Sequence, residues 1–369
     1  MNKKNRALIL ALIFIVVAIV YLEPRKIESV PEKDITLLET ESSEPQAITQ
    51  KNSYSLAPEL TGITGYLNTD EGLQLKSLRG KVVLVDFWTY TCINCLRTLP
   101  HLIDWDKKYR DQGLIIIGVH TPEFEFEKKR ENVEMAIEKY GIKYAVVQDN
   151  DYATWRAFRN RYWPHKYLID AEGYIRYDHI GEGGYEETEI KIQELLAEIG
   201  SKVSGVSIIE DTTPRQRNTP ELYAGYKFAL PRGQNIGNEE GLQTEKVVEY
   251  ELPERLQKDT LYLQGSWKSN SDNVEAISDI TSLFLDFTAG SVNIVADSLN
   301  DISLRVDVLI DGNSISSAQA GTDVQFDNGN GFIVVNEPRL YNIIDGEYGE
   351  YSLELKTKKG FTLSAFTFG

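Results

Sequence analysis

Buried strands and amphipathic helices alternate through residues 82–199, and this alternation restricts the fold more than any other feature. Near-continuous apolar runs such as 82–88 and 114–120 are typical of strands covered on both faces. Segments with helical periodicity separate them, which predicts an α/β sheet flanked by helices. A short turn at 171–173 joins the last two strands, so the sheet should be mixed. The expected strands are 82–88, 114–120, 144–149, 166–170 and 174–180, and the expected helices are 95–111, 124–140, 152–160 and 185–199.

The pattern changes after residue 202. Residues 203–218 combine Gly, Ser, Thr and Pro with mixed charge and are interpreted as a linker, which assigns the α/β domain to 58–202. From residue 219 to residue 369 only short alternating runs remain, separated by turn signals such as Asn328-Gly329. Many short strands at this spacing predict a β-sandwich or jelly roll.

The first 22 residues differ in composition from the rest. Lys3, Lys4 and Arg6 precede an apolar run from Ala7 to Leu22. An uncleaved membrane anchor over 1–22 is the favoured interpretation; a cleaved signal peptide and a buried helix of the soluble domain are the alternatives. The first two both place the remainder of the chain outside the cytoplasm. Residues 23–57, rich in Glu, Ser, Pro and Lys, are then an extracytoplasmic tether.

The formal net charge of −17 excludes one broad class of partner. Nucleic-acid binding needs a basic face that neutralises phosphates, and no such face is indicated. The acidic residues are dispersed along the chain, which is typical of a solvated surface.

The chain contains only two cysteines, Cys92 and Cys95, and they stand where a buried strand ends and a helix begins. A helix N-terminus carries exposed N–H groups and partial positive charge, which stabilise a thiolate. The spacing lets both sulfurs meet across the first helical turn. Cys92 can then attack a substrate disulfide, and Cys95 can resolve the mixed disulfide. The absence of other cysteines avoids wrong pairing in an oxidising compartment.

The cysteine pair has two alternative interpretations. A structural disulfide between residues three apart closes a very small loop and stabilises little. A zinc site needs two further ligands, and the four histidines, at 101, 120, 165 and 179, have no ligand spacing. Redox chemistry without any cofactor beyond the pair itself is therefore favoured.

The segment VVLVDFWTYTCINCLRTLP, residues 82–100, resembles the active-site segment of the thioredoxin superfamily. The resemblance implies that Pro100 kinks the helix and that Asp86 is a buried acid that exchanges protons with Cys95. It also implies a cis peptide bond before Pro164, with the backbone of Trp163 beside the sulfurs and paired with an extended substrate. An ordinary trans proline at 164 is the alternative.

A narrower resemblance is carried by WTYTCINCLRT, GVHTPEF and YWPHKYLID, which resemble extracytoplasmic TlpA-like proteins. The segments TPELYAGY (219–226), PRLY (338–341) and AFTFG (365–369) resemble the carbohydrate-binding-module-like domain of DipZ-type proteins. In such proteins a multi-span membrane domain supplies electrons, and this chain has a single short apolar segment. The resemblance therefore implies a separate membrane electron donor or acceptor of CcdA/DsbD type, with envelope protein thiols and disulfides as substrates and a glycan or protein ligand for the sandwich.

Several residues near the pair are predicted to contact the substrate: Tyr90, Ile93, Asn94, Glu123 and His165. Glu123 should follow a strand end that faces the site, where it could alter thiol pKa values; a solvated loop acid is its alternative. The aromatic residues of the second domain are more often core than sugar platforms, and a core position is favoured for Trp267.

The sequence is compatible with three functions. A membrane-tethered thiol–disulfide oxidoreductase that works as a reductase is the leading hypothesis. A thiol peroxidase shares the scaffold, and Thr89-x-x-Cys92 fits its motif, although Val85 stands where its proline should be. A non-catalytic glycan- or protein-binding envelope protein is the third. Apocytochrome c, envelope enzymes and a general pool of envelope proteins are the candidate substrates.

Overall fold

The computed structural model describes residues 54–203, 213, 216–299 and 302–369. All of these belong to one compact unit, Ser53–Gly369. The predicted anchor, the tether up to residue 53 and most of the predicted linker lie outside the described residues. Within the described part, no helix is both long enough and apolar enough to cross a membrane.

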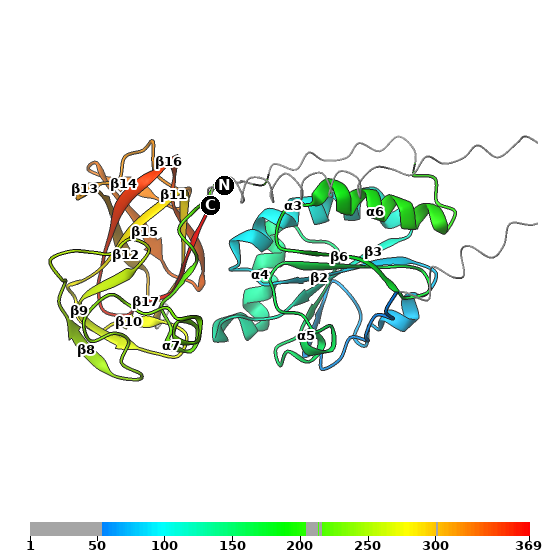
Figure 1. Ribbon diagram of the computed structural model, residues 1–369, viewed down its shortest axis with the longest axis horizontal. Helices are drawn as coiled ribbons and strands as arrows, with labels where there is room; N and C mark the ends of the chain where they lie inside the picture. Colours follow the sequence, from blue (N-terminus) through cyan, green and yellow to red (C-terminus); the bar gives the residue numbers. More distant parts are fainter. Residues whose placement is uncertain (1–53, 204–212, 214–215, 300–301) are drawn as a thin grey trace, which may run out of the picture. The chain divides into compact units, whose positions relative to one another are not determined.

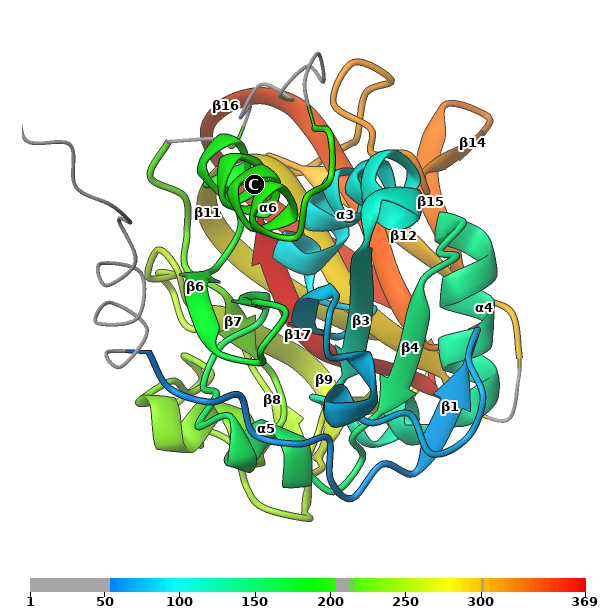
Figure 2. The ribbon, with the colours of Figure 1, turned by 90° about the vertical axis from the view of Figure 1, so that its right-hand side faces the viewer.

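The first domain is built on a six-stranded mixed sheet in the order β1-β4-β3-β2-β5-β6 (Figures 1 and 2). Strands β2, β3 and β4 pair in parallel, while β5 and β6 form the predicted antiparallel hairpin. The α/β prediction is confirmed; the short edge strand β1 was not predicted. The strands are β1 (Gly65–Leu67), β2 (Val82–Trp88), β3 (Leu114–His120), β4 (Ala145–Gln148), β5 (His165–Ile169) and β6 (Ile175–Ile180), and the α-helices are α3 (Ile93–Tyr109), α4 (Arg130–Tyr140), α5 (Ala153–Ala157) and α6 (Tyr185–Glu198).

Strand β2 is buried along its whole length because each face of the sheet has its own core. Val82, Leu84 and Trp88 pack with buried residues of α3, α4 and α6. Val83 and Phe87 point the other way and pack toward α5 and the segment before β2. Figure 1 shows α3 and α6 on one side of this sheet and α5 on the other. Asp86 shares the parity of Leu84 and Trp88, so it faces the side that α3 covers.

Helix α3 begins at Ile93, two residues before the predicted start. Cys92 is the N-cap, and its Sγ accepts a hydrogen bond from the backbone N–H of Cys95 at 3.3 Å. The sulfur thus takes the position that a hydroxyl or carboxylate oxygen usually occupies at a helix start. Pro100 lies inside the helix, as predicted.

The predicted β-rich domain is confirmed, and hydrogen bonds join its strands into one eleven-stranded sheet. The two longest strands, β11 and β16, pair with each other and connect the parts of this sheet. The first part of β11 also pairs with β9, and its second part pairs with β17. Register shifts near Ala289 and Val292 bend β11 between these two parts. The strands are β7 (Leu222–Tyr223), β8 (Val247–Tyr250), β9 (Leu261–Ser269), β10 (Val274–Ala276), β11 (Thr281–Ser298), β12 (Leu304–Ile310), β13 (Asn313–Ser314), β14 (Gln325–Asp327), β15 (Asn330–Val335), β16 (Arg339–Thr357) and β17 (Phe361–Phe368).

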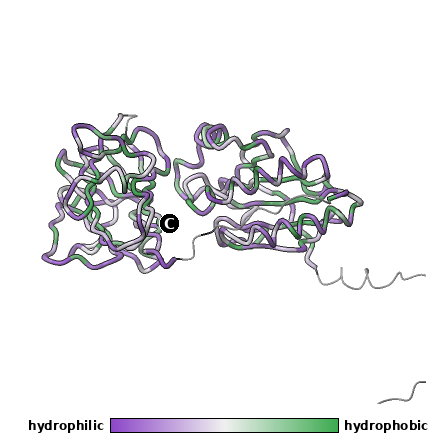
Figure 3. Tube along the Cα trace, turned by 90° about the horizontal axis from the view of Figure 1, so that it is seen from above, coloured by the Kyte–Doolittle hydropathy of each residue, from purple (hydrophilic) through white to green (hydrophobic). Residues whose placement is uncertain are grey.

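The core of the second domain contains most of its aromatic side chains. Trp267 is fully buried, as favoured from the sequence, and Tyr250 and Tyr341 are buried as well. Tyr348 is 41% exposed. Figure 3 shows hydrophobic residues running through the interior of each domain, with hydrophilic residues on the outer segments.

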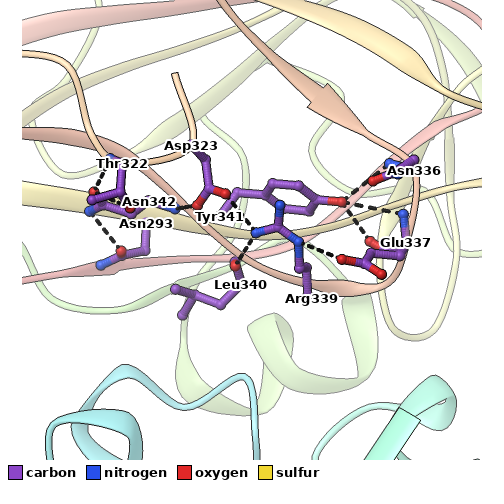
Figure 4. Close-up of polar contacts among 9 residues, drawn as sticks. All are labelled: Asn293, Thr322, Asp323, Asn336, Glu337, Arg339, Leu340, Tyr341 and Asn342. Atoms are coloured by element: carbon purple, nitrogen blue, oxygen red, sulfur yellow. Dashed lines mark hydrogen bonds and ion pairs between the residues drawn. The ribbon is translucent and has the colours of Figure 1, made fainter. Parts of the chain in front are cut away.

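A polar cluster fixes the start of β16 (Figure 4). The Arg339 guanidinium lies 3.7 Å from the centre of the Tyr341 ring and pairs with Asp323 and Glu337, each at 2.9 Å. Tyr341 in turn donates to the carbonyl of Glu337 at 2.7 Å. The segment from Glu337 to Leu340 lines a small cavity together with Tyr90 and residues of α4, so this part of the second domain lies near the loop that precedes Cys92.

Candidate active site

The two cysteines are free thiols with different environments. Cys92 is partly exposed, and Cys95 is 1% exposed. Burial raises the pKa of the Cys95 thiol well above its ordinary value, and neighbouring Cys92 adds to the effect. The accessible sulfur is therefore suited to attack, and the buried one needs a base before it can react.

Asp86 is the acid on the same side of the sheet as Cys95. It is 1% exposed, and no hydrogen-bond partner of its Oδ1 lies among the described residues. Burial raises the pKa of Asp86 to about 7, and the charge of Lys166 opposes this rise. The negative charge of Asp86 in turn raises the pKa of Cys95. A carboxyl that titrates near neutrality beside a buried thiol is suited to take its proton.

Lys166 is a site residue that sequence reasoning missed. It stands opposite Asp86 in the antiparallel pairing of β2 with β5 and is fully buried. Its Nζ donates to the carbonyl of Gly181 at 3.0 Å and lies 5.6 Å from the centre of the Tyr185 ring. Only the register of β2 with β5 shows that Asp86 and Lys166 are neighbours.

Glu127 was also missed, and it holds the turn that leads into Cys92. The carboxylate is fully buried and accepts hydrogen bonds from the hydroxyls of Thr89, at 2.6 Å, and Thr91. It also accepts from the backbone N–H groups of Glu123, at 2.5 Å, and Phe124, at 2.9 Å. Burial raises the pKa of Glu127, and these donors oppose the rise. In the sequence Glu127 is indistinguishable from the neighbouring exposed acids, so no local signal marks it.

Glu127→Gln is expected to destabilise the protein by about 2 kcal/mol, because the amide would point N–H donors at groups that are themselves donors. Urea unfolding measures the change. Glu125→Gln is the matched control, since Glu125 is largely exposed and its pair with Lys128 contributes little. Equal effects of the two substitutions would contradict the role given to Glu127.

His120 belongs to the buried support of the site. It is fully buried, stacks on Tyr90 at 5.7 Å between ring centres, and lies edge-on to Trp88 at 5.4 Å. Its Nε2 is 3.3 Å from the hydroxyl of Thr89. Burial lowers the pKa of His120 to about 3, so the ring is neutral at physiological pH.

A cavity of about 170 Å³ lies at Cys92. From the first domain it is lined by Cys92, Ile93, Asn94, Glu123 and Trp163, all of which the sequence selected. The peptide bond from Trp163 to Pro164 is cis, as predicted. The indole N–H of Trp163 donates to the carbonyl of Thr121 at 3.1 Å, which fixes the ring at the cavity wall.

Two predicted docking residues lie elsewhere. Tyr90 is 5% exposed and borders the separate small cavity beside α4. His165 is also 5% exposed: its Nδ1 lies 2.7 Å from the side chain of Asn160, and its Nε2 lies 2.9 Å from Asp178. Both polar atoms of the His165 ring are thereby engaged within the fold, which places it among the supports of β5.

The second domain forms the remaining wall of the cavity at Cys92. Thr219, Glu221 and Tyr223 line it from one segment, and Thr367 and Phe368 line it from the end of β17. Side chains of α3 also pack against the core of the second domain, among them that of Ile93. Sequence reasoning did not find these wall residues, because nothing local links positions so far apart in the chain.

Comparison with known proteins agrees with this geometry. Residues 56–178 match the AhpC/TSA family, and residues 219–369 match the thioredoxin like C-terminal domain. The thiol-disulfide oxidoreductase YkuV of Bacillus subtilis is 30% identical over 141 residues, 38% of this chain and 94% of YkuV. The chain belongs to the thioredoxin-like thiol–disulfide oxidoreductase family. The thiol-disulfide oxidoreductase ResA of Halalkalibacterium halodurans is 31% identical over 34% of this chain and 68% of ResA.

A third relative matches both domains of this thioredoxin-like chain. Protein DipZ of Mycobacterium tuberculosis is 36% identical over 327 residues, which is 87% of this chain. The chain spans less than half of DipZ, 44% of its length. The resemblance of the second domain to the corresponding part of DipZ-type proteins, expected from the sequence, is therefore confirmed.

Proposed function

We propose that this protein is an extracytoplasmic, membrane-tethered thiol–disulfide oxidoreductase that works as a reductase through Cys92 and Cys95. The observation that carries the proposal is the pair itself: an accessible sulfur at a helix N-terminus, in the wall of a cavity, with a buried thiol and Asp86 behind it. The basic and apolar N-terminal sequence supports the tether and the location.

The reaction follows from the different environments of the two sulfurs. The Cys92 thiolate attacks one sulfur of a substrate disulfide, the substrate S–S bond breaks, and the leaving thiolate takes up a proton. Cys95 then passes its proton to Asp86 and attacks the Cys92 sulfur, which releases the second substrate sulfur as a thiolate that takes up a proton. Two electrons have moved to the substrate, and the pair has become a disulfide. A separate membrane dithiol protein of CcdA/DsbD type is the proposed electron donor, and envelope proteins are the proposed substrates.

The reduction potential of the pair tests the direction. The full chain in detergent micelles is equilibrated in graded dithiothreitol buffers, its free thiols are alkylated, and the mass is read. A strongly reducing potential, near that of reductive thioredoxins, supports the reductase; a markedly oxidising one overturns that direction. Failure of the pair to exchange with the buffer at all would overturn the proposed function.

The AhpC/TSA match makes a thiol peroxidase the second candidate. The geometry favours it less, since Thr89 is fully buried and gives its hydroxyl hydrogen to Glu127. Rapid peroxide consumption with a sulfenic acid on Cys92 would favour the peroxidase.

A glycan or protein ligand for the second domain is a further prediction. Most of the aromatic residues that could stack on a sugar, Trp267 among them, are core residues and do not support it.

A further inference from the structure

The Tyr223 hydroxyl lies within hydrogen-bond distance of two carboxyl groups at the wall of the cavity at Cys92. Its hydroxyl oxygen lies 2.7 Å from Oε1 of Glu123 and 2.8 Å from Oε2 of Glu221. A phenol has one hydrogen, so it can donate to only one of the two carboxyl groups and must accept from the other. One of the two carboxyl groups in this arrangement therefore carries a proton.

The surroundings of Glu123 favour its protonated form. Its side chain is 6% exposed. Burial, then the charges of Glu221 and Glu127, raise the pKa of Glu123 to about 8. The hydroxyl of Tyr223 and the guanidinium of Arg232, whose Nη2 lies 3.9 Å from Oε1, oppose this rise.

Two further groups complete the environment. Tyr152, which donates to the carbonyl of Pro122, also faces the charge of Glu123. The guanidinium of Arg232 lies 4.4 Å from the centre of the Tyr223 ring. Arg232 stands at the edge of ion-pair distance from Glu123, so its charge offsets only part of the rise in the Glu123 pKa.

The carboxyl pair lies where a proton is needed. Glu123, Glu221 and Tyr223 line the same cavity as Cys92. When the Cys92 thiolate attacks an alkyl disulfide, the leaving group is an alkyl thiolate, a strong base that departs faster if it is protonated as the bond breaks. Asp86 cannot serve here, because it is buried on the Cys95 side of the pair.

We propose that Glu221 and Tyr223, supplied by the second domain, are positioning residues that keep a proton on Glu123 for the thiolate that leaves when Cys92 attacks an alkyl disulfide. This inference rests on the proposed exchange function. The substrate S–S bond breaks, the departing thiolate takes the proton from Glu123 and leaves as a thiol, and water in the cavity restores the proton. The second domain is thereby part of the active site, and the substrates are alkyl disulfides of the cysteine type.

Two probe disulfides separate this role from a structural one. Oxidised glutathione releases an alkyl thiolate, whereas a nitrobenzoate aromatic disulfide releases a thiolate that is stable without a proton. Stopped-flow rates of the reduced full chain are measured with both between pH 6 and pH 9. For the wild type, the rate with glutathione disulfide relative to the aromatic disulfide should fall as the pH rises through about 8, because Glu123 then loses its proton.

Glu221→Gln removes the like charge beside Glu123 and should lower the pKa of Glu123. At pH 8 we expect a roughly 10-fold slower reaction with glutathione disulfide, an unchanged reaction with the aromatic disulfide, and recovery at pH 6. Glu254→Gln is the matched control, since Glu254 is an exposed acid of the same domain. Glu123→Gln should slow the alkyl reaction most at pH 6, and its difference from the wild type should narrow toward pH 9, where Glu123 has lost its proton.

The outcomes distinguish the inference from the function on which it rests. Equal slowing of both probes by Glu221→Gln would indicate a structural effect and overturn the inference, as would parallel wild-type profiles for the two disulfides. The wild-type comparison needs no variant, so the inference stays testable even if Glu221→Gln does not fold. A wild-type protein that reacts with neither disulfide would overturn the proposed function itself.

Discussion

Full-length protein carrying Cys92→Ser is expected to lose disulfide exchange by roughly 1,000-fold or more, because the accessible thiolate that attacks the substrate is gone. The fold should be preserved, since a serine hydroxyl at the N-cap of α3 can accept the hydrogen bond that the Cys92 sulfur accepts from the N–H of Cys95. Reduction of oxidised glutathione measures the activity, and urea unfolding checks the fold.

Cys95→Ser is the matched variant, because it also replaces a thiol sulfur with a hydroxyl oxygen, at the second cysteine. It keeps the attacking sulfur and removes the one that resolves the mixed disulfide, so stable covalent complexes with substrate proteins should accumulate. Mass spectrometry of non-reduced envelope extracts detects them. Exchange activity that survives Cys92→Ser, or a Cys95→Ser protein that captures nothing, would contradict the mechanism.

Asp86→Asn is expected to slow release of the mixed disulfide by about 100-fold at pH 8. Burial raises the pKa of Asp86 from 3.8 to about 7, so the carboxylate that can take the proton of Cys95 forms only as the pH rises through 7. The wild-type rate should therefore rise across this range, and the variant should lack this inflection. At higher pH the two rates should converge, because hydroxide replaces the missing base.

Single-turnover kinetics between pH 5 and pH 10 measure this effect. The pre-formed mixed disulfide between Cys92 and glutathione is the starting material, so that attack by Cys95 alone is observed. Asp151→Asn serves as the control, since Asp151 is exposed and lies in the turn before α5. An inflection near pH 7 that persists in Asp86→Asn would remove Asp86 from the proton transfer.

The elements of the first domain were predictable because their signals are local. The apolar run of β2 and the helical periodicity of α6 depend on backbone geometry within a few residues, and both appear within two residues of the expected bounds. Errors arise where tertiary contacts compete with the pattern. Ile190, one of the apolar residues within the periodic segment 185–199, is 37% exposed. The first part of the helix expected over 124–140 is a separate turn of 3₁₀-helix at Glu125–Lys128.

The sequence by itself selected the two cysteines, the buried residue Asp86 and the first-domain residues that line the cavity at Cys92. Cys92 and Cys95 could be selected because a strand–helix junction, with its dipole, is encoded in consecutive residues. Asp86 was selected because residues 82–100 resemble the active-site segment of the thioredoxin superfamily. Only the tertiary structure decided that Lys166 opposes Asp86, that Glu127 holds the turn before Cys92, and that the second domain completes the cavity. Tyr223 and Glu123 meet across 100 positions of the chain. Such contacts depend on strand register and domain packing, which no periodicity of neighbouring residues encodes.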